Sequence, residues 1–174
     1  SAAAQAAAQA AAEAEAAAEA LGALNPLAYR PFNLFVGDAR RAFWISSVDQ
    51  TGAPVMRVEE IPEGISMLTD MNRNDPAAPR VRLYLPRFEN APAPDPENDD
   101  WDWWRTLLAD KEFEPGTGPK GAMNIDIAID AAGDFGTVSS SLIALPGIGA
   151  ARRKIRWLFA AGEPETVPYE AVQL

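Results

Sequence analysis

The chain has 174 residues, of which 48% are hydrophobic and 23% charged, as is ordinary for one globular domain with a sizeable core. Its 25 acidic and 15 basic residues give a net charge of −10, which argues against nucleic acid and anionic membranes as partners, because both need a basic face. Since it contains neither Cys nor His, it can form no disulfide, thiolate nucleophile, Ser-His-Asp relay, ordinary zinc site or histidine-ligated haem.

The first 21 residues are dominated by Ala, with Gln and Glu between them, and this composition predicts a helix. Gly22 and the pair Asn25-Pro26 provide the stop, so we treat residues 1–22 as a separate alanine-rich helix. Only its later part, from about Glu13, is expected to pack firmly. We find no signal peptide and no membrane-spanning run, and we predict a cytoplasmic protein without membrane partners.

Three runs rich in β-branched and aromatic residues follow, at 29–38, 42–48 and 54–59. They are separated by the short turn that begins at Gly37-Asp38 and by residues 49–53. Short turns join antiparallel neighbours, so these residues predict a three-stranded meander whose third strand, which starts with Pro54, lies nearer an edge.

Two helices are expected next, on either side of a proline-rich acidic loop at 89–100. Asp75 and Pro76 suit the start of the first helix, and Pro86 should kink or end it. The second helix begins near Asp99 or Asp100 and contains three tryptophans, at positions 101, 103 and 104. Trp101 and Trp104 share a helical face, whereas Trp103 does not. The three rings are interpreted either as core anchors or as the wall of a ligand site.

The remaining residues predict strands at 123–129, 133–145, 154–161 and 169–174. Residues 133–145, GDFGTVSSSLIAL, are apolar on both faces at their far end, so we expect a central strand covered on both sides. The near end carries hydroxyls, among them Thr137, Ser139 and Ser140. They either line a ligand site or bond to neighbouring backbone and fill tight space.

The sum of these elements is an α+β fold with two or three helices and mostly antiparallel strands. Several strands are apolar on both faces, which requires two stacked sheets with helices outside. We therefore expect residues 23–174 to form a single α+β sandwich domain.

Four segments together resemble the NRDE family, also called the transport and Golgi organisation family: YRPFNLFVGDARRAFW, IPEGISMLTDMNRNDPAAPRVRLYLPRF, GDFGTVSSSLIAL and WLFAAGEPETVPYEAV. The resemblance extends from about residue 17 to residue 174. It implies an αββα sandwich like that of N-terminal-nucleophile hydrolases, in agreement with the strand pattern. It also implies a function in amide-bond hydrolysis, in haem trafficking, or in lipid or acyl-thioester metabolism.

The chain departs from the family pattern at its start. Family members begin with a Cys in a strand, followed by an Asn-Arg-Asp-Glu segment, whereas this chain has no Cys and opens with an alanine-rich helix. The run Asn72-Arg73-Asn74-Asp75 is in the wrong place to be that segment. The chain thus resembles the C-terminal two-thirds of a member, part of a longer domain, and we expect a missing N-terminal segment or a second chain as partner. Ser1 enters a helix rather than a buried strand, so it is a poor candidate for the nucleophile.

Two functions follow as hypotheses. In the first, the chain supplies the wall of a site for amide-type hydrolysis, with polar liners or oxyanion donors at Asn33, Asn72, Thr137, Ser139 and Ser140. Each Asn has an equally plausible role in a turn or cap. In the second, a small-molecule ligand, haem or an acyl chain, binds beside Trp103 without catalysis. No catalytic residue, metal site or resident cofactor is assigned, and the chain alone is expected to be inactive, as scaffold only. Open sheet edges further predict a completing partner or association between copies.

Overall fold

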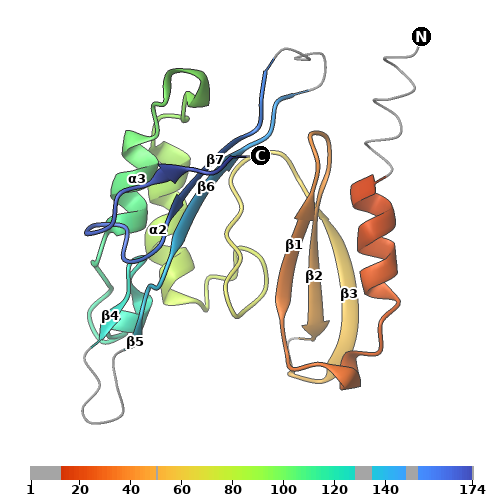
Figure 1. Ribbon diagram of the computed structural model, residues 1–174. Helices are drawn as coiled ribbons and strands as arrows, with labels where there is room; N and C mark the ends of the chain where they lie inside the picture. Colours follow the sequence, from red (N-terminus) through yellow and green to blue (C-terminus); the bar gives the residue numbers. More distant parts are fainter. Residues whose placement is uncertain (1–12, 50, 128–134, 148–152, 174) are drawn as a thin grey trace. The chain divides into compact units, whose positions relative to one another are not determined.

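The computed structural model describes residues 13–49, 51–127, 135–147 and 153–173 (Figure 1). It is a mixed α+β structure with small antiparallel sheets, which confirms the predicted class. The chain divides into two compact units. The first comprises Ser1–Arg73 and Leu145–Lys154, and the second comprises Asn74–Ala144 and Ile155–Leu174. The sheets have two or three strands each and are not closed, and the finer expectation of an αββα sandwich stays a prediction.

The first unit contains the predicted three-stranded meander. Strands β1 (Asn33–Gly37), β2 (Ala42–Val48) and β3 (Pro54–Ile61) pair antiparallel in that order, so β2 is central. The turns are closed by aspartates whose side chains accept backbone hydrogen bonds. Asp38 Oδ1 accepts from Arg40 N at 2.7 Å, and Asp49 Oδ1 accepts from Thr51 N at 2.8 Å. Because these bonds join residues close together in the chain, the meander could be predicted from the sequence.

One face of this sheet is covered by the N-terminal helix, whose described part covers residues 13–22 (Figure 1). Ala14 and Ala18 pack against Phe43 and Ile45 of β2, and all four are buried. Methyl side chains let the helix approach the sheet closely, so the alanine composition suits the contact as well as the helix. A short 3-10 helix, η1 (Pro26–Ala28), links this helix to β1.

In the second unit the helices are α2 (Pro79–Asn90) and α3 (Asp102–Ala109), with short 3-10 helices η2 (Pro96–Asn98) and η3 (Pro119–Gly121). The predicted start of α2 at Asp75-Pro76 is wrong. Asp75 Oδ1 accepts from Ala77 N at 2.9 Å in a preceding turn, and Pro79 takes the first helical position instead. Pro86 lies inside α2 without ending it. No helix in the described ranges is long and apolar enough to cross a membrane.

The strands of the second unit form two small sheets. Strands β4 (Asp126–Ile127) and β5 (Phe135–Gly136) make a short hairpin-like pair, and β6 (Ser140–Ala144), β7 (Arg156–Ala160) and β8 (Glu170–Ala171) pair antiparallel in that order. The predicted single strand at 133–145 is therefore wrong: its described part is two strands, β5 and β6, in different sheets.

The prediction that this strand is central and covered on both faces is also wrong, because β6 is an edge strand and one of its faces is exposed. Its side chains alternate as a strand requires, but only one face is covered. Leu142 is buried, whereas its neighbour Ile143 is 57% exposed. Apolar side chains on both faces of a strand therefore do not show that both faces are covered.

Candidate functional site

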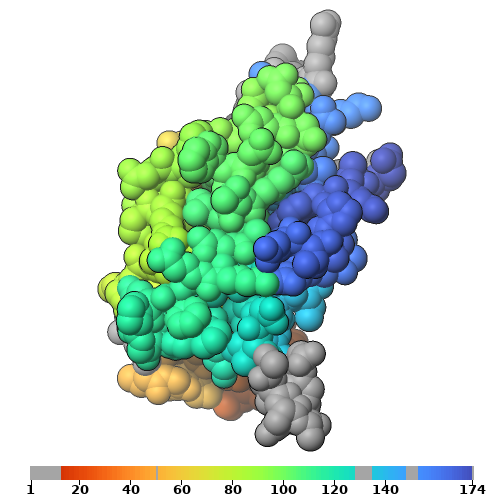
Figure 2. Space-filling view, turned by 90° about the vertical axis from the view of Figure 1, so that its left-hand side faces the viewer, coloured from red at the N-terminus to blue at the C-terminus, as the bar shows by residue number. Residues whose placement is uncertain are grey.

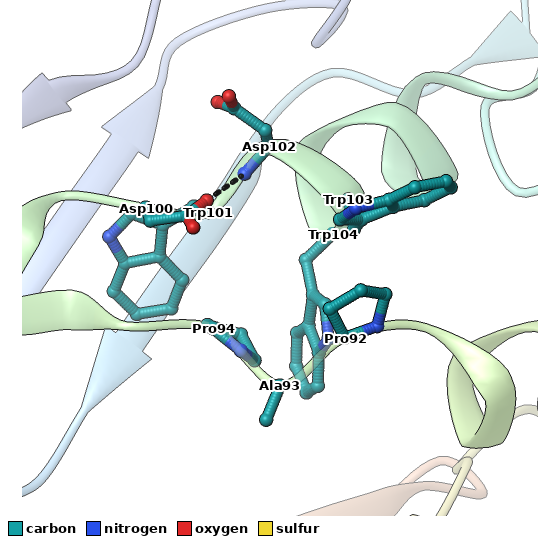
Figure 3. Close-up of a pocket in the computed structure, with 8 residues that line it drawn as sticks. All are labelled: Pro92, Ala93, Pro94, Asp100, Trp101, Asp102, Trp103 and Trp104. Carbon is teal, nitrogen blue, oxygen red and sulfur yellow. Dashed lines mark hydrogen bonds between the residues drawn. The ribbon is translucent and has the colours of Figure 1, made fainter.

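A shallow hollow lies in the second unit, where the acidic loop meets the start of α3 (Figure 3). It offers about 10 Å³ to the centre of a water-sized group, which is about the room that one water molecule needs. Its lining comes from two short segments: Pro92, Ala93 and Pro94 on one side, and Asp100, Trp101, Asp102, Trp103 and Trp104 on the other.

The three indoles of the hollow differ in burial. Trp101 is 4% exposed and precedes the first residue of α3, and Trp104 packs edge-to-face against Phe88 of α2 with ring centroids 5.3 Å apart. Trp103 is 58% exposed. Trp101 and Trp104 are thus core anchors that also line the hollow, whereas Trp103 is left to the solvent side, as its position off the helical face predicted.

Asn33 lies in the first unit, and protein groups use its whole side-chain amide. Its Nδ2 donates to Thr69 O at 2.8 Å and to Met71 O at 3.2 Å, and its Oδ1 accepts from Trp44 Nε1 at 2.9 Å. Asn33 therefore fixes the backbone at 69–71 against the sheet. Asn72 follows directly, half-buried in a bend, and its side chain makes no hydrogen bond within the described part of the chain.

The predicted hydroxyl residues lie in the second unit: Thr137, Ser139 and Ser140. Two of them are engaged in hydrogen bonds and one is not. Thr137 Oγ1 accepts from Ile125 N at 2.9 Å, and Ser140 Oγ shares a hydrogen bond of 2.5 Å with Tyr169 Oη. Ser139 is exposed and has no hydrogen bond within the described residues. Of the five predicted polar liners, Asn72 in the first unit and Ser139 in the second therefore have side chains available to bind a ligand.

One polar cluster in the second unit was not predicted. Lys111 Nζ contacts three carboxylates: Glu163 Oε1 at 2.5 Å, Glu165 Oε2 at 3.1 Å and Asp126 Oδ2 at 3.4 Å. Hydrogen bonding to Glu163 and then Glu165 raises the pKa of Lys111, and the bond from Lys111 is the largest cause that lowers the pKa of Glu163. These contacts join the C-terminal segment, blue in Figure 2, to the segment after α3.

Behind this cluster lies Asn124, whose side chain is fully buried. Its Nδ2 donates to Glu163 Oε1 at 3.0 Å and to Ala109 O at 3.4 Å, whereas Oδ1 has no partner among the described residues. The residues of this cluster are up to 54 positions apart, from Lys111 to Glu165, and each belongs to a segment that the sequence marks as a loop or solvated strand face. No sequence signal connects them.

Tyr84 of α2 forms a second unpredicted network in the second unit. Its hydroxyl lies 2.7 Å from Glu112 O and 3.1 Å from Asp110 Oδ1. Arg87 completes the network through ion pairs to Asp110 at 3.0 Å and Glu112 at 2.8 Å. Burial, reinforced by the Asp110 carboxylate, raises the pKa of Tyr84 to about 12. The network fixes the chain after α3 to α2.

We expect Tyr84→Phe to lower the free energy of unfolding by about 1 kcal/mol, the usual net worth of one hydrogen bond. The change should also remove a pH dependence. Because the folded-state pKa of about 12 exceeds the ordinary value of about 10, the tyrosine's contribution is complete below pH 10 and is lost as the pH rises to 12. Urea unfolding at pH 8 and pH 11.5 should show the gap between wild type and variant shrinking.

Tyr29→Phe is the matched control for that measurement, because Tyr29 is 51% exposed and its edge-to-face contact with Phe32 needs only the ring. It should change the free energy of unfolding by no more than about 0.5 kcal/mol. A constant gap between wild type and Tyr84→Phe at both pH values contradicts the assignment.

No group of three or more His, Cys, Asp or Glu side chains within the described ranges is arranged to hold a metal ion. The three carboxylates that do gather there surround the Lys111 ammonium. Ser1, considered above as a nucleophile, lies outside the described residues. No protein-family model, curated protein or solved structure matches the chain. The fold and site thus define an α+β protein with a small aromatic hollow and two clamped polar networks.

Proposed function

We propose that this chain supplies the wall of a site for amide-type hydrolysis in a cytoplasmic protein of the NRDE type. Its αββα sandwich would be completed by an N-terminal segment or by a second chain. The nucleophile of that site comes from outside these 174 residues, since they contain no Cys. The proposal is supported by the resemblance of four ordered segments and by the antiparallel meander of β1, β2 and β3.

The observation that carries the proposal is the clamped amide of Asn33. Because the side chain of Asn33 donates its two amide hydrogens to Thr69 O and Met71 O, it cannot also donate to a substrate. It holds in place the backbone that leads to Asn72, whose amide is available. Asn33 is then a positioning residue, and Asn72 is the wall donor. In the second unit, Thr137 and Ser140 are likewise engaged in hydrogen bonds within the protein, and the hydroxyl of Ser139 between them is available as a second wall donor.

The test uses the intact protein, including the segment that carries the family's Cys, and a panel of amide, lactam and thioester substrates. Asn72→Ala and Ser139→Ala are assayed separately. Loss of an oxyanion donor lowers kcat by about 10²-fold or more, with the free energy of unfolding unchanged. Asn33→Ala should lower the free energy of unfolding as well, because it leaves Trp44 Nε1 and two carbonyls without their partner.

Asn98→Ala is the matched control, since Asn98 is exposed in η2 and bonds only to Asp95. It should leave kcat unchanged. No turnover of any substrate with the Cys present would falsify the hydrolase proposal. If the protein turns over a substrate and neither Asn72→Ala nor Ser139→Ala lowers the rate, the assignment of these two residues as wall donors is rejected. The hydrolase proposal itself then stands.

The alternative proposal is a haem or acyl-ligand binding and trafficking protein without catalysis. The exposure of Trp103 favours it. The hollow beside Trp103 has enclosed room for only about one water, so a haem or an acyl chain would lie across the exposed face of the ring rather than inside the hollow. Haem titration followed by the Soret band tests this. Saturable binding that Trp103→Ala abolishes supports it, and unsaturable or mutation-insensitive binding rejects it.

A further inference from the structure

The hollow at the start of α3 combines aromatic faces with a surplus of negative charge. Indole rings at 101, 103 and 104 and the rings of Pro92 and Pro94 form its apolar surface (Figure 3). Residues 95–104 contain five carboxylates and no basic residue: Asp95, Glu97, Asp99, Asp100 and Asp102. An indole face attracts cations through its quadrupole, and the carboxylates add to that attraction.

The nearest cation along the chain only partly neutralises this charge. Arg105 pairs with Asp99 at 3.5 Å and with Asp102 at 3.9 Å, both at the long end of ion-pair distances. Among the described residues, the Asp100 carboxylate accepts a single weak hydrogen bond, from Asp102 N to Oδ1 at 3.4 Å. Its Oδ2 has no hydrogen bond within the described residues, and Asp100 is one of the residues that line the hollow with the indoles. Figure 3 shows the Asp102 carboxylate turned away from the rings, so Asp100 is the acidic group of the hollow.

The size of the hollow restricts its occupant. The hollow is half open and has enclosed room for about one water, so it suits a compact charged head better than a ring, a branched group or a quaternary ammonium, whose methyl groups surround the nitrogen. A primary ammonium is close to a water molecule in size and carries three donors. Its alkyl stem can lie along the exposed face of Trp103, where a long side chain buries its methylenes and keeps its charge near acidic groups.

We propose that this hollow binds the head of a primary alkylammonium ion, with Asp100 Oδ2 accepting from the ammonium and the indoles contacting it and its stem. The same chemistry is offered by a lysine side chain of a polypeptide and by a small free amine. None of the polar wall residues of the proposed hydrolase lines this hollow, so each assignment stands or falls without the other.

The full chain is titrated with n-butylammonium at pH 7 while the five indole N–H resonances are followed by NMR. We expect the signals of Trp101, Trp103 and Trp104 to shift saturably with a Kd on the order of 1–10 mM, as befits one small ligand group. Trp44 and Trp157 donate to Asn33 and Ser141, so their signals serve as internal references that stay in place. 1-Butanol, the neutral analogue, and tetramethylammonium should bind at least about tenfold more weakly.

Two variants separate a built site from a general attraction to acidic surface. Asp100→Asn should raise the Kd about fivefold or more, whereas Glu97→Gln removes one charge from the same loop outside the hollow and should raise it less than twofold. Trp103→Ala should also weaken binding, and because Trp103 is exposed the variant remains folded. Equal binding of 1-butanol, equal effects of Asp100→Asn and Glu97→Gln, or no saturable shift each overturns the proposal.

A last comparison distinguishes the two sources of the ammonium. Nα-acetyl-lysine amide that binds more tightly than n-butylammonium supports a site for a lysine of a polypeptide, because the added backbone then contributes contacts. Equal binding of the two supports a site for any alkylammonium ion.

Discussion

Asn124→Asp is expected to lower the free energy of unfolding by about 3–5 kcal/mol at pH 7, the cost of an uncompensated buried charge. Asn124 is fully buried, and its Nδ2 donates to Glu163 Oε1 at 3.0 Å. The substitution replaces that donor by a carboxylate oxygen that faces another carboxylate. Lys111 cannot serve both groups, since it is already shared among Asp126, Glu163 and Glu165.

The pH dependence of this loss identifies its cause. Burial and the Glu163 charge both raise the pKa of the new carboxyl in the folded state above its unfolded value of about 3.9. When the pKa of a carboxyl is higher in the folded state than in the unfolded state, the free energy of unfolding falls as the pH rises above the unfolded value. The loss becomes smaller as the pH falls back towards that value. Urea unfolding should therefore show a smaller gap between wild type and variant at pH 5 than at pH 7.

Asn124→Leu is the control for that experiment, because it also removes the donor to Glu163 but introduces no charge. It should be less destabilising than Asn124→Asp at pH 7, and its gap from wild type should not change between pH 5 and pH 7. Equal losses for the two variants at both pH values show that packing, rather than charge, sets the cost at this position.

What the sequence could reveal was local. The meander of β1, β2 and β3 is legible because Asp38 and Asp49 close its turns within a few residues. The separation of Trp103 from the face shared by Trp101 and Trp104 follows from helical spacing alone. The start of α2 was misplaced because Asp75 and Pro76 are a better local start signal than Ala78 and Pro79, where no side chain caps the helix, and Asp75 caps the preceding turn instead.

The candidate site was less accessible to sequence reasoning, because its geometry depends on distant pairs. Nothing near Asn33 in the sequence shows that its amide is spent on Thr69 and Met71, 36 and 38 residues away. Likewise nothing near Ser139 shows that its neighbour Ser140 is paired with Tyr169. The sequence identified which polar side chains to consider, and tertiary hydrogen bonds sort them into clamped and available ones.

The purified 174-residue chain is expected to associate with itself, or to retain a second polypeptide, rather than to remain a monomer. Strand β6 is an edge strand, with Ile143 57% exposed, and Val138 just before it is 81% exposed. In the first unit, β1 is likewise an edge strand and exposes Phe35. Apolar edge strands offer unpaired backbone groups and uncovered side chains to another chain.

The size of the expected effect follows from the area concerned. Covering roughly 400 Å² of apolar surface at about 25 cal/mol per Å² contributes on the order of 10 kcal/mol, comparable to the stability of a whole domain. A partner that pairs with β6 would cover Ile143 and supply the missing hydrogen bonds in one step. The same area left uncovered would leave the chain marginally stable.

Light scattering on the chain expressed alone measures its mass in solution, and urea unfolding measures its cooperativity. Ile143→Lys provides the matched variant, because a lysine on an edge strand opposes strand pairing while its long stem still covers neighbouring apolar surface. We expect the wild-type mass to exceed that of one chain and to rise with concentration, and the variant to be smaller on average at the same concentration. A monodisperse wild-type monomer with one sharp unfolding transition and no second polypeptide contradicts the prediction, since the exposed strands would then be stable in water without a partner.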